Sequence, residues 1–125
     1  MTDLIACLST GKGTWGHVSR LVNSGEFKNI YLITNDFGKE NFNNENGCIM
    51  VVVDSKTNSI EEMSEKIKEE LKDKIEGNQV AVNLISGTGK EHMAVISAVL
   101  KLGLGIRQVV YDFENQKVDE LKVTD

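Results

Sequence analysis

Apolar and polar positions divide the chain into alternating blocks. Continuously apolar runs cover residues 4–8, 30–33 and 49–53, and mainly apolar runs cover residues 80–85 and 106–111. Runs of this length bounded by turn residues indicate buried strands. Between them, apolar residues recur every three or four positions over 18–22, 60–75 and 93–102, which indicates helices. Residues 118–123 alternate after a turn at 114–116, which predicts a half-exposed edge strand.

This order of elements predicts one Rossmann-like α/β domain over residues 1–125. We expect a mostly parallel sheet of about six strands, with helices on both faces and a C-terminal antiparallel hairpin. The segment 37–47 is rich in Asn, Gly and Glu, so it predicts a surface loop in place of a helix. Ligands of such sheets bind at the carboxyl ends of the strands where the strand order reverses. If the first and fourth strands are neighbours there, the turns that follow them face one crevice.

Composition narrows the classes of protein. The net charge of −5 argues against coating duplex nucleic acid, although it permits a pocket for one phosphorylated ligand. No apolar run approaches the ~20 residues of a membrane span, and the N-terminus lacks a signal-peptide pattern, so we expect a cytoplasmic protein without membrane contact. Cys7 and Cys48 lie within apolar runs, which predicts buried thiols, and no His or Cys has metal-ligand spacing, so we predict no metal.

The turn after the fourth strand, Ser86-Gly87-Thr88-Gly89-Lys90, carries the clearest chemical signal. A strand that ends in glycines before a helix leaves backbone N–H groups free to hold an anion, usually a phosphate. Lys90 in the first helical turn opposes the macrodipole unless a negative group is present. Simple helix capping is the alternative, because Thr88 and Glu91 form a capping-box pattern. Capping explains those two residues, but not the two glycines and the lysine.

The turn after the first strand permits a second interpretation. Residues 11–16 read G-x-G-x-x-G between a predicted strand and a helix, and Asp36 lies twenty residues after Gly16. This spacing is typical of a nicotinamide-dinucleotide site, in which the acidic residue binds a ribose hydroxyl. Lys12 and Trp15 are bulky for so tight a turn, and two polar residues separate the strand from the glycines. Those features weaken the dinucleotide interpretation.

Taken together, the two turns resemble those of the CRISPR-associated Rossmann fold family. The shared features are small hydroxyl residues after the first strand and a Ser-Gly-Thr-Gly-Lys turn before an apolar helix. The resemblance covers nearly the whole chain and implies a homodimer that binds a cyclic oligoadenylate across its two-fold axis, without a cofactor. Some relatives, the ring nucleases, cleave that ligand without metal, using a Ser or Thr after the first strand and a Lys in the second turn. The matching positions are Ser9 or Thr10, and Lys90.

Each candidate residue has an expected role. Ser9 would orient a ribose hydroxyl, Lys90 or Lys12 would neutralise charge on the phosphate, and His17 is the candidate general acid or base. The expected ligand-binding residues are Thr10, Gly11, Lys12, Gly13, Thr14, Asn35, Ser86, Gly87, Thr88 and Gly89. Trp15 stacks on an adenine or packs against its own helix, and His17 equally fits a packing role. Because no effector segment follows the domain in this sequence, we expect stand-alone binding, with or without cleavage.

Overall fold

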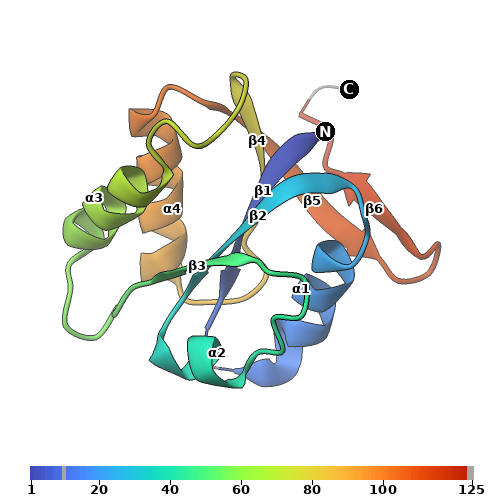
Figure 1. Ribbon diagram of the computed structural model, residues 1–125, viewed down its shortest axis with the longest axis horizontal. Coiled ribbons are helices and arrows are strands. Elements are labelled where there is room, and N and C mark those ends of the chain that lie inside the picture. Colours follow the sequence, from blue (N-terminus) through green and yellow to red (C-terminus); the bar gives the residue numbers. More distant parts are fainter. Residues whose placement is uncertain (10, 124–125) are drawn as a thin grey trace.

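Six strands form one sheet in the order β3-β2-β1-β4-β5-β6 in the computed structural model, which describes residues 1–9 and 11–123 (Figure 1). The first five strands are parallel and β6 is antiparallel to β5. The elements are β1 (Thr2–Leu8), the 3-10 turn η1 (Lys12–Thr14), α1 (Trp15–Val22), β2 (Phe27–Thr34), α2 (Asp36–Asn41), β3 (Ile49–Val52), α3 (Ile60–Leu71), β4 (Gln79–Asn83), α4 (Gly89–Lys101), β5 (Gly105–Asp112) and β6 (Lys117–Glu120).

Helices cover both faces of the sheet, so the core has two layers. Successive side chains of a strand point to opposite faces, and in β1 Ile5 and Cys7 join the layer under α3 and α4, whereas Leu4, Ala6 and Leu8 join the layer under α1. Figure 1 shows α3 and α4 together on one side of the sheet and α1 on the other, with α2 by the ends of the strands. The predicted mostly parallel sheet with a closing antiparallel hairpin is therefore confirmed.

The predicted loop over 37–47 is wrong in its first part, because residues Asp36–Asn41 form α2. The side chain of Asn35 caps this short helix by accepting a hydrogen bond from the Gly38 N–H at 2.9 Å. Gly38 packs against the ends of β1 and β2, where a Cβ would lie 2.0 Å from Thr34 Oγ1. The helix has no apolar periodicity, and the contacts of Gly38 and Phe37 with other segments hold it together with its cap. The sequence pattern for that reason did not reveal it.

The boundaries of other elements differ from the apolar pattern in smaller ways. α3 ends at Leu71, although apolar spacing continues to Ile75, because the chain leaves the helical conformation at Lys72 and takes φ +63° at Asp73. β2 begins at Phe27, before the apolar run at 30–33.

Both cysteines are buried and free. Cys7 lies in β1 and Cys48 directly precedes β3, with β2 between these strands. Burial raises the pKa of each thiol above its ordinary value, and the Glu91 carboxylate adds to the rise at Cys7. Within residues 1–9 and 11–123, no helix combines the length and apolar composition needed to cross a membrane.

Candidate functional site

The strand order reverses between β1 and β4. From β1 the chain builds outward through β2 and β3, and it then returns to place β4 on the other side of β1. Ala6 of β1 pairs with Asn83 of β4, so the turns after the two strands begin side by side at the carboxyl edge. The expectation that the first and fourth strands are neighbours is confirmed. Crevices in doubly wound sheets form at such points.

A buried hydrogen-bond network joins the two turns. The Ser9 backbone N–H donates to Ser86 Oγ at 3.3 Å, and Ser9 Oγ donates to Glu91 Oε1 at 3.0 Å. The same carboxylate oxygen accepts from the Thr88 N–H at 2.7 Å. Ser9, Ser86 and Glu91 are at most 3% exposed. The Ser9 hydroxyl is therefore hydrogen-bonded within the protein. Through this bond Glu91 connects the end of β1 to the start of α4.

Sequence reasoning identified Glu91 only as a capping residue. The capping box of Thr88 and Glu91 is present, which confirms the predicted cap of this helix. It does not by itself account for the bond from Ser9 to Glu91. The bond from Ser9 depends on the adjacency of β1 and β4, which no local pattern encodes. The buried carboxylate at the centre of the two turns was for that reason missed.

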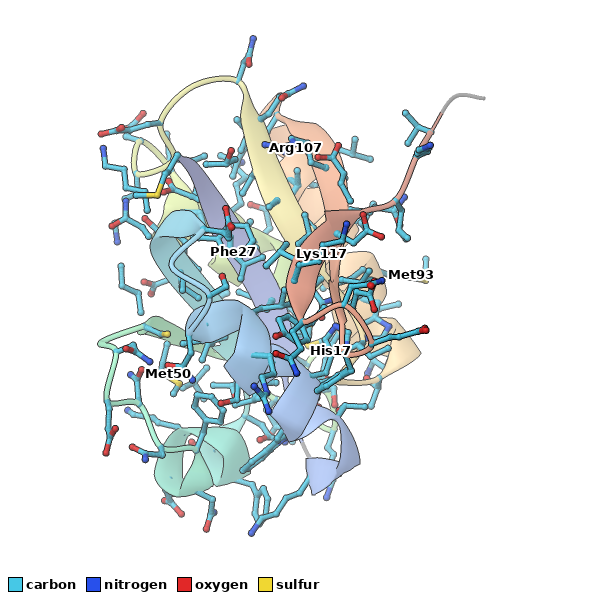
Figure 2. All side chains as sticks on the ribbon, turned by 90° about the vertical axis from the view of Figure 1, so that its right-hand side faces the viewer. His17, Phe27, Met50, Met93, Arg107 and Lys117 are labelled. Atoms are coloured by element: carbon cyan, nitrogen blue, oxygen red, sulfur yellow. The ribbon has the colours of Figure 1, made fainter. Side chains whose placement is uncertain are left out.

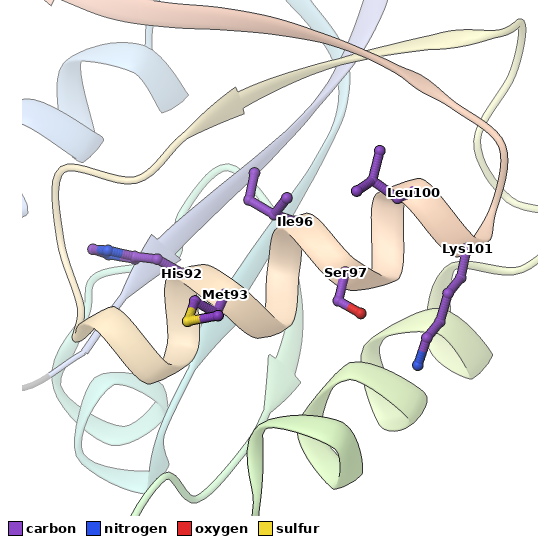
Figure 3. Close-up of a pocket in the computed structure, with 6 residues that line it drawn as sticks. All are labelled: His92, Met93, Ile96, Ser97, Leu100 and Lys101. Carbon is purple, nitrogen blue, oxygen red and sulfur yellow. The ribbon is translucent and has the colours of Figure 1, made fainter.

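Gly87 is required by both conformation and space. Its φ of +100° lies in the region that favours glycine, and a Cβ would lie 3.0 Å from Glu91 Oε1 and 3.3 Å from Cys7 Cβ. His92 Nε2 lies 2.8 Å from the Ser86 carbonyl oxygen, a contact in which the protonated nitrogen donates. His92, at the start of α4 in Figure 3, therefore stabilises the turn at Ser86 and Gly87 through this hydrogen bond.

Lys90 lies toward the connection between β3 and α3. Its ammonium donates to the carbonyl oxygens of Ser55 at 2.6 Å and Asn58 at 3.0 Å. Ser9 and Lys90, expected to act together, thus bond to different partners. A cation in the first turn of α4 does not oppose the helix dipole at close range when its long side chain extends to other carbonyl groups.

The first turn presents a cation and aromatic rings. Lys12 is exposed, and its ammonium lies 5.7 Å from the Trp15 ring centroid and 5.5 Å from that of Phe37, which are cation–π distances. Trp15 Nε1 donates to the Ser9 carbonyl at 2.8 Å, and the indole packs on Phe37 and Phe42. The indole thus packs on rings of α2 and the residue after it instead of against its own helix, and stacking on an adenine stays a prediction. Phe37, 39% exposed, is an aromatic group at this edge that the loop prediction overlooked.

The glycines of the G-x-G-x-x-G motif are not closely packed. In a dinucleotide fingerprint the third glycine permits close contact between helix and strand. Here a Cβ on Gly16 would meet no atom within 4 Å, and the same holds for Gly11 and Gly13. Asp36 opens α2 instead of ending β2. The sequence therefore matches the motif, but Gly16 lacks the close helix–strand packing for which the dinucleotide fingerprint requires a glycine.

His17 joins α1 to the C-terminal hairpin. Its Nε2 accepts a hydrogen bond from the Tyr111 backbone N–H at 3.0 Å and lies 3.3 Å from Asn83 Nδ2. Asn83 also donates to the Val109 carbonyl at 2.8 Å. Figure 2 shows His17 between α1 and the hairpin. Partial burial lowers its pKa, and its acceptor nitrogen is occupied in this bonding. His17 therefore packs against the hairpin instead of near Trp15, and its role as a general acid or base stays a prediction.

The remaining candidate ligand-binding residues lie at the starts of helices. Thr14 caps α1 without a side-chain bond to the helix, Asn35 caps α2, and Gly89 opens α4 with free space where a Cβ would lie. Thr10 lies outside the described residues. Within the part of the chain that the structure describes, no three His, Cys, Asp or Glu side chains are grouped as a metal site requires.

The arrangement is suited to holding an anion. The capping box engages the N–H groups of Thr88 and Glu91, so an anion would bind to the other N–H groups, at Gly89 and the open glycines of the first turn. Lys12 supplies a positive charge at the same edge. No protein-family model matches the chain, and a search of curated proteins found no match either.

Proposed function

We propose that the chain binds a cyclic oligoadenylate at the carboxyl edge between β1 and β4, in a site completed by a second copy. The observation that carries this proposal is the meeting of two glycine-containing turns at the point where the strand order reverses. Nucleotide ligands of open α/β sheets bind at that position.

Free space around the glycines supports the choice of a phosphate ligand. A Cβ at Gly11, Gly13 or Gly89 would meet no atom within 4 Å, so a ligand can approach the backbone there. Gly89 is the first residue of α4, whose N-terminus favours an anion. A cyclic oligoadenylate presents several phosphates to such turns and several bases to nearby aromatic rings such as Phe37.

Binding is favoured over cleavage as the basic activity. Cleavage through the expected residues would require Ser9 to release Glu91 and Lys90 to release the carbonyls of Ser55 and Asn58. Binding requires neither change. The test therefore measures binding first and follows the same samples for linear product.

A dinucleotide is the competing ligand, because the same strand order is also that of dinucleotide-binding domains. The open surroundings of Gly16 disfavour it, since the fingerprint uses that glycine for close packing. NAD therefore serves as the competitor in the experiment.

The experiment measures binding of radiolabelled cyclic tetra- and hexa-adenylate by gel shift, with NAD as competitor. We expect binding that excess NAD does not displace, and a Kd about tenfold higher in Lys12→Ala, because one charge-assisted contact is lost. Lys117→Ala is the matched control: it removes one positive charge from β6 and should leave the Kd unchanged.

Absence of binding to both cyclic ligands, or displacement by NAD, would overturn the proposal. Conversion to linear product would extend the function to that of a ring nuclease and make Ser9→Ala the next variant. Bound ligand recovered intact would identify a sensor or a sink for the messenger.

A further inference from the structure

The connection between α2 and β3 contains an Asn-Gly pair in an exposed turn. Asn46 is the one asparagine of the sequence that a glycine follows, and both Asn46 and Gly47 are exposed. The Gly47 N–H donates to the Asn44 carbonyl oxygen at 3.3 Å, which closes a turn over residues 44–47, and Gly47 takes φ +67°. A Cβ on Gly47 would meet no atom within 4 Å, so the backbone can rotate there without a clash.

The same connection holds two other asparagines in different surroundings. The Asn44 side chain accepts from the Cys48 N–H at 2.8 Å and donates to the Cys48 carbonyl oxygen at 2.9 Å, so the backbone of one residue holds both ends of its amide. Asn43 is exposed, but Asn44 follows it in place of a glycine. The three residues therefore form an internal comparison, in which Asn46 alone combines exposure with a following glycine.

We propose that Asn46 is a site of spontaneous deamidation, a reaction to which asparagine is prone. The Gly47 backbone nitrogen attacks Cγ of Asn46 and forms an N–C bond, while Nδ2 leaves with the displaced proton as ammonia. The product is a cyclic imide. Water then adds to one of the two imide carbonyl carbons and breaks its C–N bond, which yields aspartate or isoaspartate at position 46. A following glycine favours the attack because no Cβ crowds the nitrogen.

Two exposed hydrogen bonds have to open before the imide ring can close. The Gly47 N–H must leave the Asn44 carbonyl oxygen, and their 3.3 Å distance is long for such a bond. The Asn46 amide must turn away from Asn23 Oδ1, to which its Nδ2 donates. Asn23 is exposed at the end of α1, so water can replace it. This bond therefore slows the reaction without preventing it.

The reaction loosens the connection from α1 and adds one negative charge. Nδ2 of Asn46 is lost, and a carboxylate oxygen then faces Asn23 Oδ1, so that two acceptors meet and the bond between them is gone. Asn23 Nδ2 already donates to Ser19 Oγ at 3.3 Å. The start of the connection stays in place, because Phe42 packs on Trp15. The change is therefore local and leaves the fold intact.

The test is peptide mapping by mass spectrometry after incubation of the folded protein at neutral and at mildly alkaline pH. We expect isoaspartate and aspartate to accumulate at position 46, faster at alkaline pH because the attacking nitrogen must lose its proton, while Asn43 and Asn44 stay intact. Asn46→Gln is the matched control: it keeps an exposed amide but would need a larger ring, and should abolish the change. Asn23→Ala should raise the rate about two- to tenfold, the factor for one exposed hydrogen bond.

An Asn46 that stays intact in the folded protein would overturn the proposal, as would equal modification of Asn43. Aspartate without isoaspartate would overturn the imide route, because hydrolysis of the imide yields both products. An unchanged rate in Asn23→Ala would overturn the restraining role of Asn23. Far-UV circular dichroism checks that each variant keeps the fold, which the exposure of both positions predicts. Because no ligand is present, these outcomes are independent of the binding assay.

Discussion

Gly38 shows at the residue scale how tightly the carboxyl edge is built. A Cβ there would lie 2.0 Å from Thr34 Oγ1 and 3.0 Å from the Leu8 carbonyl oxygen. Gly38→Ala should lower the free energy of unfolding by about 1–3 kcal/mol, the usual range for overpacking a close contact. Urea unfolding followed by circular dichroism measures this change.

Gly16→Ala is the matched substitution in open space. Because Gly16 lies in the first turn of α1 and its Cβ would meet no atom within 4 Å, we expect a stabilisation of up to about 1 kcal/mol from helix propensity. A loss of stability as large as that of Gly38→Ala would mean that Gly16 is closely packed after all. That result would support the dinucleotide interpretation, in which the third glycine of the motif is closely packed.

His17 should make stability depend on pH. Its Nε2 accepts from the Tyr111 N–H and faces the Asn83 amide, so protonation would turn this acceptor into a third donor. Burial lowers the folded-state pKa below the ordinary 6.5, and the unfolded chain therefore binds the proton more readily. The contribution of His17 to stability is complete above about pH 6.5 and is lost as the pH falls below that value.

The measurement compares the free energy of unfolding of the wild type with that of His17→Gln from pH 8 to pH 5. Glutamine keeps an acceptor but does not titrate, so the difference between the two proteins isolates His17 from His92 and the carboxylates. We expect the wild type to lose stability relative to the variant as the pH falls. Parallel profiles would show that His17 is not held as an acceptor.

At the element scale, two helices begin with the same cap but in different surroundings. Ser59 and Glu62 cap α3 at an exposed position, whereas Thr88 and Glu91 cap α4 with a buried carboxylate that also accepts from Ser9. Glu91→Ala should lower the free energy of unfolding by about 2–3 kcal/mol, because it leaves the buried Ser9 hydroxyl without its acceptor and removes the cap of the Thr88 N–H. Glu62→Ala should have a smaller effect, since water can replace its contacts. Equal losses in urea unfolding would contradict a joining role for Glu91.

The sequence predicted elements best where local patterns decide them. Both capping boxes and the buried strands follow from short apolar runs and from residues such as Ser59 and Thr88. α2 was missed because its stability depends on Gly38 fitting against Thr34 and Leu8, a tertiary contact. The end of α3 was placed too late because the apolar spacing continues to Ile75 after the helix has ended.

In the whole molecule, the position of the candidate site could be predicted from the sequence, whereas the directions of its side chains could not. Its location followed from the sequence, because alternating strands and helices place the turns after β1 and β4 at one edge. The directions of the side chains did not follow. Lys90 extends to Ser55 and Asn58, and Ser9 to Glu91, because segments distant in the sequence supply the partners.

We propose that two copies of the chain share one cyclic nucleotide at the edge between β1 and β4. Its most direct test is isothermal titration calorimetry of the wild-type protein with cyclic tetra-adenylate and cyclic hexa-adenylate, and separately with NAD. We expect saturation at one cyclic ligand per two chains for at least one ring size, and no saturable heat with NAD. Saturation by NAD at one molecule per chain, with no heat from either cyclic ligand, would contradict it.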